Sequence, residues 1–286
     1  MLQMEMAFVS TVIGTVILNA QENTITAGDN GIQVSNGGKV TVTARGENGN
    51  HITAKNTGIY IEGKNSSVDI GGQITKIQAA ASDSGDVFGI DMSGGTIDLK
   101  QNGTDIVVEA STANGNATGI HLTTKKEYGE AYLHTTSAAG DVTISADSKT
   151  GGSAVGIKVE GGSVFDLSAD SVFVQANAES KSITSSNPTA TPAVGIQTSV
   201  GGELTIQTVH DITIGARAED DSTSRNSTGI EVTGNENNSS TVKLSSEQGS
   251  ISINPLTGIG TETSIQGLAD DIKHFEYGIH GNMGPM

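Results

Sequence analysis

The stretch that decides the fold is AVGIKVEGGSVFDLSADSVFVQANAES, residues Ala154–Ser180. It holds three short segments in which apolar and polar residues alternate. The Gly161–Gly162 pair separates the first two segments, and a polar corner at Asp170 precedes the third. Alternation with a period of two over four to six residues is typical of a half-buried strand. This stretch therefore predicts three strands joined by two turns.

The same pattern recurs along most of the chain, and each copy contains the dipeptide Gly-Ile. One such unit is too short to bury its own apolar face, whereas stacked units bury a continuous core. The repeat therefore predicts an all-β protein, a parallel β-helix (β-solenoid) with three short strands per coil and roughly eight coils. A β-sandwich with hairpin connections is the alternative, but it does not require the same dipeptide at the same place in each unit. The nine glycines of the dipeptide are Gly31, Gly58, Gly89, Gly119, Gly156, Gly195, Gly229, Gly258 and Gly278.

The repeat also predicts which side chains face inward. We expect one interior ladder built from the isoleucines of the dipeptide, namely Ile32, Ile59, Ile90, Ile120, Ile157, Ile196 and Ile230. The glycine before each isoleucine would turn a tight corner at positive φ. Val164 and Leu167 are both predicted to face inward although they are three residues apart. Their strand would then need a bulge, with Phe165 facing outward.

The domain organisation follows from the limits of the repeat. Residues 1–28 are predicted to form an N-terminal cap or first strands, with the apolar run Ala7–Leu18 as a buried starting strand or cap. Residues 29–260 form the β-helix repeat domain. Residues 261–286 form a C-terminal tail or cap, and the helix-like spacing of apolar residues in Ile265–Phe275 allows a short helix there.

Charge and composition exclude some classes of partner. The formal net charge is −17, from 32 acidic and 15 basic residues. Such a chain repels phosphate backbones, so we expect no nucleic-acid partner. The chain has no cysteine, which excludes disulfides and thiolate chemistry.

The unit GIKVEGGSVFDLSADSVFVQANAES resembles the passenger repeats of autotransporter (type V secreted) proteins of bacteria, as do GIDMSGGTIDLKQNGTDIVVEASTANGNATGI and its other copies. The resemblance covers about Asp29 to Gly260. It implies a right-handed β-helix, secreted to the bacterial cell surface or beyond it, that acts in adhesion or cell–cell contact. It also implies an outer-membrane β-barrel translocator in the full-length protein, of which this chain would be a passenger fragment.

Residues suited to catalysis are scattered in the sequence. Outward carboxylates are expected at Asp69, Asp91, Asp98 and Glu160, but none has an arginine at a matching position. Paired carboxylates, or a base beside a metal or arginine, would be needed for hydrolysis or elimination on a polysaccharide. The sequence therefore predicts no catalytic, cofactor-binding or metal-binding residue and no cofactor. The arginines are Arg45, Arg217 and Arg225, and the histidines are His51, His121, His134, His210, His274 and His280.

Aspartate recurs just before the third strand of several units, at Asp105, Asp141 and Asp211, with Asp170 one place earlier. A ladder of carboxylates could bind Ca²⁺ or act on a sugar. Aspartate also bonds its own backbone in turns, and we favour this corner role. The tandem nine-residue motif of calcium-binding solenoids does not occur.

These observations favour an adhesin-like rod that presents polar loops to a host, matrix or neighbouring-cell protein or glycan. The longest loops, Asn177–Val194 and Arg217–Thr228, are the expected binding loops, because insertions in a solenoid project from one edge. One alternative is a polysaccharide-degrading β-helix enzyme, a lyase or hydrolase. The other is a structural surface rod that associates with itself.

Overall fold

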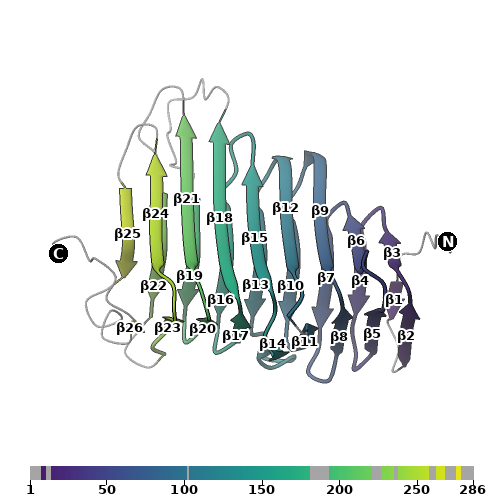
Figure 1. Cartoon of the computed structure of the whole chain (residues 1–286). Coiled ribbons are helices and arrows are strands. Elements are labelled where there is room, and N and C mark those ends of the chain that lie inside the picture. The colour runs from purple at the N-terminus through teal and green to yellow at the C-terminus, as the bar shows by residue number, and fades with distance from the viewer. Residues whose placement is uncertain are drawn as a thin grey trace.

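The strands of this protein stack as parallel ladders, each pairing with the equivalent strand one repeat away (Figure 1). The structure is a computed structural model that describes residues 8–10, 14–101, 103–180, 193–220, 227–234, 238–257, 262–267 and 275–277. Three parallel sheets of nine, nine and eight strands enclose one core, with successive strands of the chain assigned to the three sheets in turn. This confirms the predicted parallel β-helix of eight three-strand coils.

The first sheet has nine strands, seven of which contain a Gly-Ile dipeptide, while the dipeptides at Gly258 and Gly278 lie outside the described residues. Its nine members are β1 (Phe8–Ser10), β4 (Asn30–Val34), β7 (Thr57–Glu62), β10 (Val87–Ser93), β13 (Ala117–Thr123), β16 (Ala154–Glu160), β19 (Ala193–Ser199), β22 (Ser227–Thr233) and β25 (Glu262–Gly267).

The second sheet follows the glycine-rich turns. Its nine members are β2 (Thr15–Ala20), β5 (Lys39–Ala44), β8 (Ser67–Gly72), β11 (Gly95–Gln101), β14 (Ala131–Ser137), β17 (Val164–Ala169), β20 (Glu203–Thr208), β23 (Thr241–Ser246) and β26 (Phe275–Tyr277).

The third sheet completes each coil and contains the longest strands, which rise highest in the middle of Figure 1. Its eight members are β3 (Asn23–Thr26), β6 (Asn50–Ala54), β9 (Thr75–Ser84), β12 (Ile106–Asn114), β15 (Asp141–Ser148), β18 (Ser171–Ser180), β21 (Ile212–Asp220) and β24 (Ile251–Thr257).

The predicted isoleucine ladder is confirmed. From Ile32 to Ile230 each isoleucine pairs in register with the next, and each is at most 2% exposed. Branched aliphatic side chains stacked in this way bury apolar surface against identical neighbours above and below. The core therefore runs along the whole stack as one cluster.

The prediction for strand β17 was right for Leu167 but wrong for Val164, for Phe165 and for the bulge. Phe165 is fully buried and Leu167 is 1% exposed, whereas Val164 lies half-buried on the outer face. The register with β20 runs without a bulge, because Phe165 and Leu167 are two residues apart and alternate correctly. Alternation counted back from Leu167 assigns Phe165 to the core, so the sequence pattern held the correct answer, which the prediction missed because Val164 is apolar as well.

The role predicted for the Gly-Ile glycines was also wrong. Gly156 lies inside a strand and is not among the glycines with positive φ. A Cβ built on it would stand 2.5 Å from the Gly195 carbonyl oxygen of the next coil and 2.4 Å from Val174 Cγ1. The position therefore excludes a side chain because the backbone of the next coil and a side chain of the third sheet both lie close to it. The glycine-rich turns do use positive φ, as at Gly161 (φ 66) and Gly162 (φ 78).

The long strands of the third sheet pack on a second cluster, made mostly of alanines such as Ala176 and Ala178. Small side chains let the third sheet approach the starts of the first-sheet strands. As a result, residues 177–180 and 217–220 continue β18 and β21, although we predicted them to open long loops. Residues 181–192 and 221–226 of those loops lie outside the described residues.

Both ends of the stack differ in detail from the expectations. Strand β2 covers part of the apolar run, but only one face of it meets the core, and Ile17 is 67% exposed. Of the segment that allowed a helix, Ile265–Gly267 belong to β25 and Phe275 begins β26, while residues 268–274 lie outside the described part. The described residues form no helix, hence none that could cross a membrane.

Candidate functional site

A row of polar side chains runs along the outer face of the first sheet, at the position that follows each Gly-Ile dipeptide. Tyr60 pairs in register with Asp91, Asp91 with His121, and His121 with Lys158. Because parallel strands stack equivalent positions directly above one another, residues about 30 places apart in the sequence become neighbours. The centre of this row is His121.

His121 is held between two carboxylates from the coils on either side. Its Nδ1 lies 2.8 Å from Asp91 Oδ1 and its Nε2 lies 3.0 Å from Glu160 Oε2. The imidazole is only 17% exposed, and the Phe88 ring stacks beside it with centroids 5.7 Å apart. Lys158 Nζ also lies 3.1 Å from Glu160 Oε2, so two cations meet one carboxylate.

This arrangement requires a protonated imidazole. A neutral ring donates one hydrogen bond only, whereas an imidazolium donates to both carboxylates. Burial lowers the pKa of His121, but the hydrogen bonds to Asp91 and Glu160 together outweigh burial and raise it above its ordinary value of 6.5. The hydrogen bond from His121 likewise lowers the pKa of Glu160 to about 2.

The His121 cluster, defined as Asp91, His121, Lys158 and Glu160, can hold or transfer a proton at a half-buried surface position. It is not arranged as a metal site, because the two carboxylates lie on opposite sides of the ring. Within the described ranges, no three His, Asp or Glu side chains are placed to hold a metal ion. Ser199 Oγ donates to the second oxygen of Glu160 at 3.2 Å, which fixes that carboxylate further.

The other two predicted outward carboxylates lie on a different face. Asp69 and Asp98 are register neighbours on the second sheet, and Lys100 Nζ lies 3.0 Å from the first and 3.4 Å from the second. His134 Nε2 is 3.8 Å from Asp98. The four predicted carboxylates thus form two separate groups, and the lysine here lies beside a half-buried acidic pair.

The corner aspartates bond the neighbouring coil, whereas we predicted bonds to their own turn. Asp105 Oδ1 accepts the backbone N–H of Asp141 at 3.0 Å, and Asp211 Oδ1 accepts that of Ser250 at 2.8 Å. Asp170 pairs with His210 Nδ1 at 2.8 Å, with both side chains about half exposed. An open hollow of about 560 Å³ follows this corner, but the Asp105 carboxylate in it already caps the next coil.

A second feature of the first sheet's edge is an insertion after β13. Most turns between the first and second sheets are short: a single residue, Gly94, joins β10 to β11, whereas residues 124–130 separate β13 from β14. The inserted loop closes on itself, because Tyr128 N–H and Gly129 N–H both donate to the Lys125 carbonyl oxygen at 2.9 Å. Lys125 Nζ also stands 5.6 Å from the centre of the Tyr128 ring.

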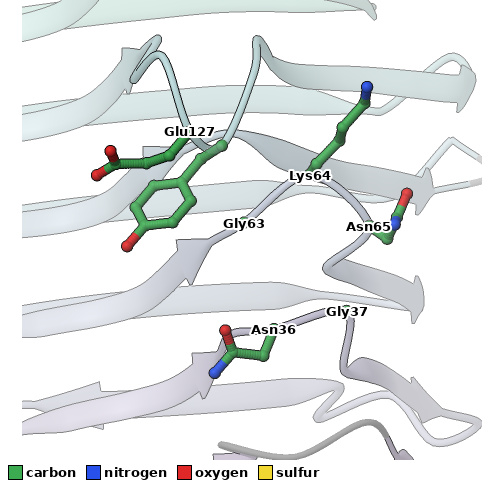
Figure 2. A pocket seen from close by; sticks show the side chains of 7 residues that line it. Asn36, Gly37, Gly63, Lys64, Asn65 and Glu127 are labelled. Atoms are coloured by element: carbon green, nitrogen blue, oxygen red, sulfur yellow. The ribbon is translucent and has the colours of Figure 1, made fainter.

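This loop folds back over two neighbouring coils. The Tyr128 hydroxyl hydrogen-bonds Glu62, which also accepts from the Tyr60 hydroxyl at 2.5 Å; these two bonds lower the pKa of Glu62. The loop passes over Gly94, where a Cβ would stand 2.5 Å from the Tyr128 carbonyl oxygen. Beneath it lies a pocket of about 410 Å³ between the loop and two glycine-containing turns, which belong to the two coils that precede the Gly94 coil (Figure 2). Its lining residues are Asn36, Gly37, Gly63, Lys64, Asn65, Glu127 and Tyr128.

Sequence reasoning named Asp91 and Glu160 but missed their connection through His121. The signal was present, because Tyr60, Asp91, His121 and Lys158 each follow a Gly-Ile dipeptide. Aligning the repeats on that dipeptide places them in one row. Of the remaining histidines, His51 Nε2 contacts the Asn48 carbonyl oxygen at 2.7 Å. His274, His280 and Arg225 lie outside the described residues.

Comparison with known proteins does not identify a family for this chain. No protein-family model matches the chain. No curated protein and no solved structure matches it significantly.

Proposed function

We propose that this chain is an adhesin-like passenger rod of an autotransporter-type protein on the bacterial cell surface. The observation that supports the proposal is that the strand ladders and their core repeat from coil to coil, whereas the loops between them differ in length. The three ladders continue through eight coils, whereas length varies only in loops and strand ends, including the insertion at residues 124–130. A stiff scaffold that varies only at its loops suits the presentation of binding loops.

Binding to surfaces tests this proposal directly. The purified chain is immobilised and probed with fibronectin, laminin, collagen, a glycan array and intact epithelial or bacterial cells. We expect saturable binding to at least one of them, and loss of that binding after the chain is unfolded and its ladders are lost. If the folded chain binds none of these probes, the adhesive function is wrong.

The His121 cluster favours a second candidate function, a polysaccharide-degrading β-helix enzyme. The cluster brings two carboxylates and a protonated imidazole together on adjacent coils, and such groups can serve as general acid and base. This candidate predicts slow cleavage of acidic polysaccharides, measured as new reducing ends or as absorbance of unsaturated products. Asp91→Asn and Glu160→Gln should abolish the cleavage, and no turnover across a panel of polysaccharides would exclude it.

A further inference from the structure

The pocket beneath the inserted loop differs from the rest of the surface in how it is built. It takes its walls from three coils, with the turn at Asn36 and Gly37, the next turn at residues 63–65, and Glu127 on the loop above them (Figure 2). Its volume of about 410 Å³ falls in the range of about 300–1,000 Å³ that is typical of small-molecule sites.

Side-chain contacts outside the strand ladders hold the inserted loop in place. The Tyr128 hydroxyl bonds Glu62, two coils away, and Lys125 braces the Tyr128 ring. The single-residue turn at Gly94 leaves room for the loop to cross. A pocket whose walls are already held in position loses less entropy when a ligand binds.

Three polar side chains of the pocket remain available to a ligand. Among the described residues, the side chains of Lys64, Asn65 and Glu127 form no hydrogen bond or ion pair with one another or with the fold. Together they offer an ammonium donor, an amide that both donates and accepts, and a carboxylate acceptor. The half-buried aromatic residue Tyr128 forms part of the wall.

This combination selects for one class of ligand. A phosphate or sulfate would meet the carboxylate of Glu127 and the net charge of −17, and a cation would meet the ammonium group of Lys64. Hydroxyl groups donate and accept at once, so they can bond the ammonium, the amide and the carboxylate alike. We propose that this pocket binds a neutral saccharide. This inference rests on the proposed adhesive function and gives it a site and a ligand class.

The test compares intact variants on an array of neutral oligosaccharides built from hexoses and N-acetylhexosamines, with sulfated and phosphorylated counterparts beside them. Asn65→Ala and Glu127→Ala remove exposed side chains that form no hydrogen bond or ion pair with the described residues. We expect each to weaken binding of the preferred neutral glycan tenfold or more. Lys149→Ala, an exposed lysine at a distant turn outside the pocket, should leave binding unchanged.

The outcomes separate this inference from the function on which it rests. Neutral glycan binding that Asn65→Ala and Glu127→Ala do not weaken would refute the pocket while the adhesive function stands. If the chain binds matrix proteins or cells but no glycan on the array, or only charged glycans, the proposed neutral-saccharide site is likewise refuted. Absence of binding to every protein, cell and glycan probe would refute the adhesive function, and the saccharide site with it. Tyr128→Phe adds a further check, because loss of the hydroxyl should loosen the loop and weaken glycan binding with little effect on unfolding.

Discussion

His121→Gln is the substitution that tests the electrostatics of the outer face most directly. Glutamine keeps a polar side chain but cannot carry the charge that both carboxylates need. The hydrogen bond from His121 is the largest cause of the lowered pKa of Glu160, about 2 in the folded chain against an ordinary 4.5. That difference corresponds to roughly 3 kcal/mol of stability at neutral pH. Because Glu160 is still 28% exposed, water screens the interaction, and we expect a loss of about 1–2 kcal/mol.

The loss should depend on pH in a defined window. The pKa of His121 is raised in the folded chain, so its contribution is complete below 6.5 and disappears as the pH rises through the folded pKa. The pKa of Glu160 is lowered, so its contribution is complete above 4.5 and disappears as the pH falls toward 2. The free energy of unfolding should therefore differ most between wild type and His121→Gln at pH 4.5–6.5.

The measurement is urea unfolding followed by far-UV circular dichroism at pH 5.5 and pH 9, at one ionic strength. His210→Gln is the matched control, because His210 lies at the same 2.8 Å from a carboxylate but both partners are about half exposed. We expect this control to lose no more than ~0.5 kcal/mol. Equal losses for the two variants, or the same loss for His121→Gln at both pH values, would refute a charged histidine between two carboxylates.

The packing of the core leads to two further predictions, both measured as urea midpoints. Gly156→Ala should destabilise the chain by about 1–3 kcal/mol, because the new methyl group would collide with the Gly195 carbonyl oxygen. Gly28→Ala is the control and should be neutral or slightly stabilising, because no atom lies within 4 Å of a Cβ built there. Equal midpoints for the two variants would contradict the close approach of the next coil to Gly156. Phe165→Ala should cost about 3–5 kcal/mol because its ring is fully buried. Phe173→Ala, 40% exposed on the outer face, should cost less than ~1 kcal/mol, and the opposite order would mean that the register of β17 is wrong.

The fold was predictable because the information for it is local and repeated. Alternation identifies each strand, glycine pairs mark turns, and the recurring dipeptide aligns the coils, so the isoleucine ladder followed directly. The choice between Val164 and Phe165 also followed from this alternation, since Phe165, Leu167 and Ala169 are two residues apart, but the prediction placed Val164 inward because it is apolar too. The extension of β18 and β21 was missed because alanine is a weak signal of burial in a sequence.

The candidate sites were predictable only in part. Asp91 and Glu160 were recognised as outward carboxylates, and aligned repeats would have placed His121 between Asp91 and Lys158, two residues from Glu160. The pocket beneath residues 124–130 had no comparable signal. Its formation depends on where an inserted loop docks, and the hydrogen bond from Tyr128 to Glu62 joins positions in different coils.

The sequence by itself therefore determined a parallel β-helix, its three strands per coil and the identity of its main core ladder. It did so because strand pairing in a solenoid joins equivalent positions of neighbouring repeats, and each repeat carries the same alternation. Only the tertiary structure decided why the Gly-Ile glycines cannot carry a side chain, how His121 joins two carboxylates, and where the inserted loop lies. Those features depend on distances between atoms of different coils, which are set only when the coils stack and their side chains pack.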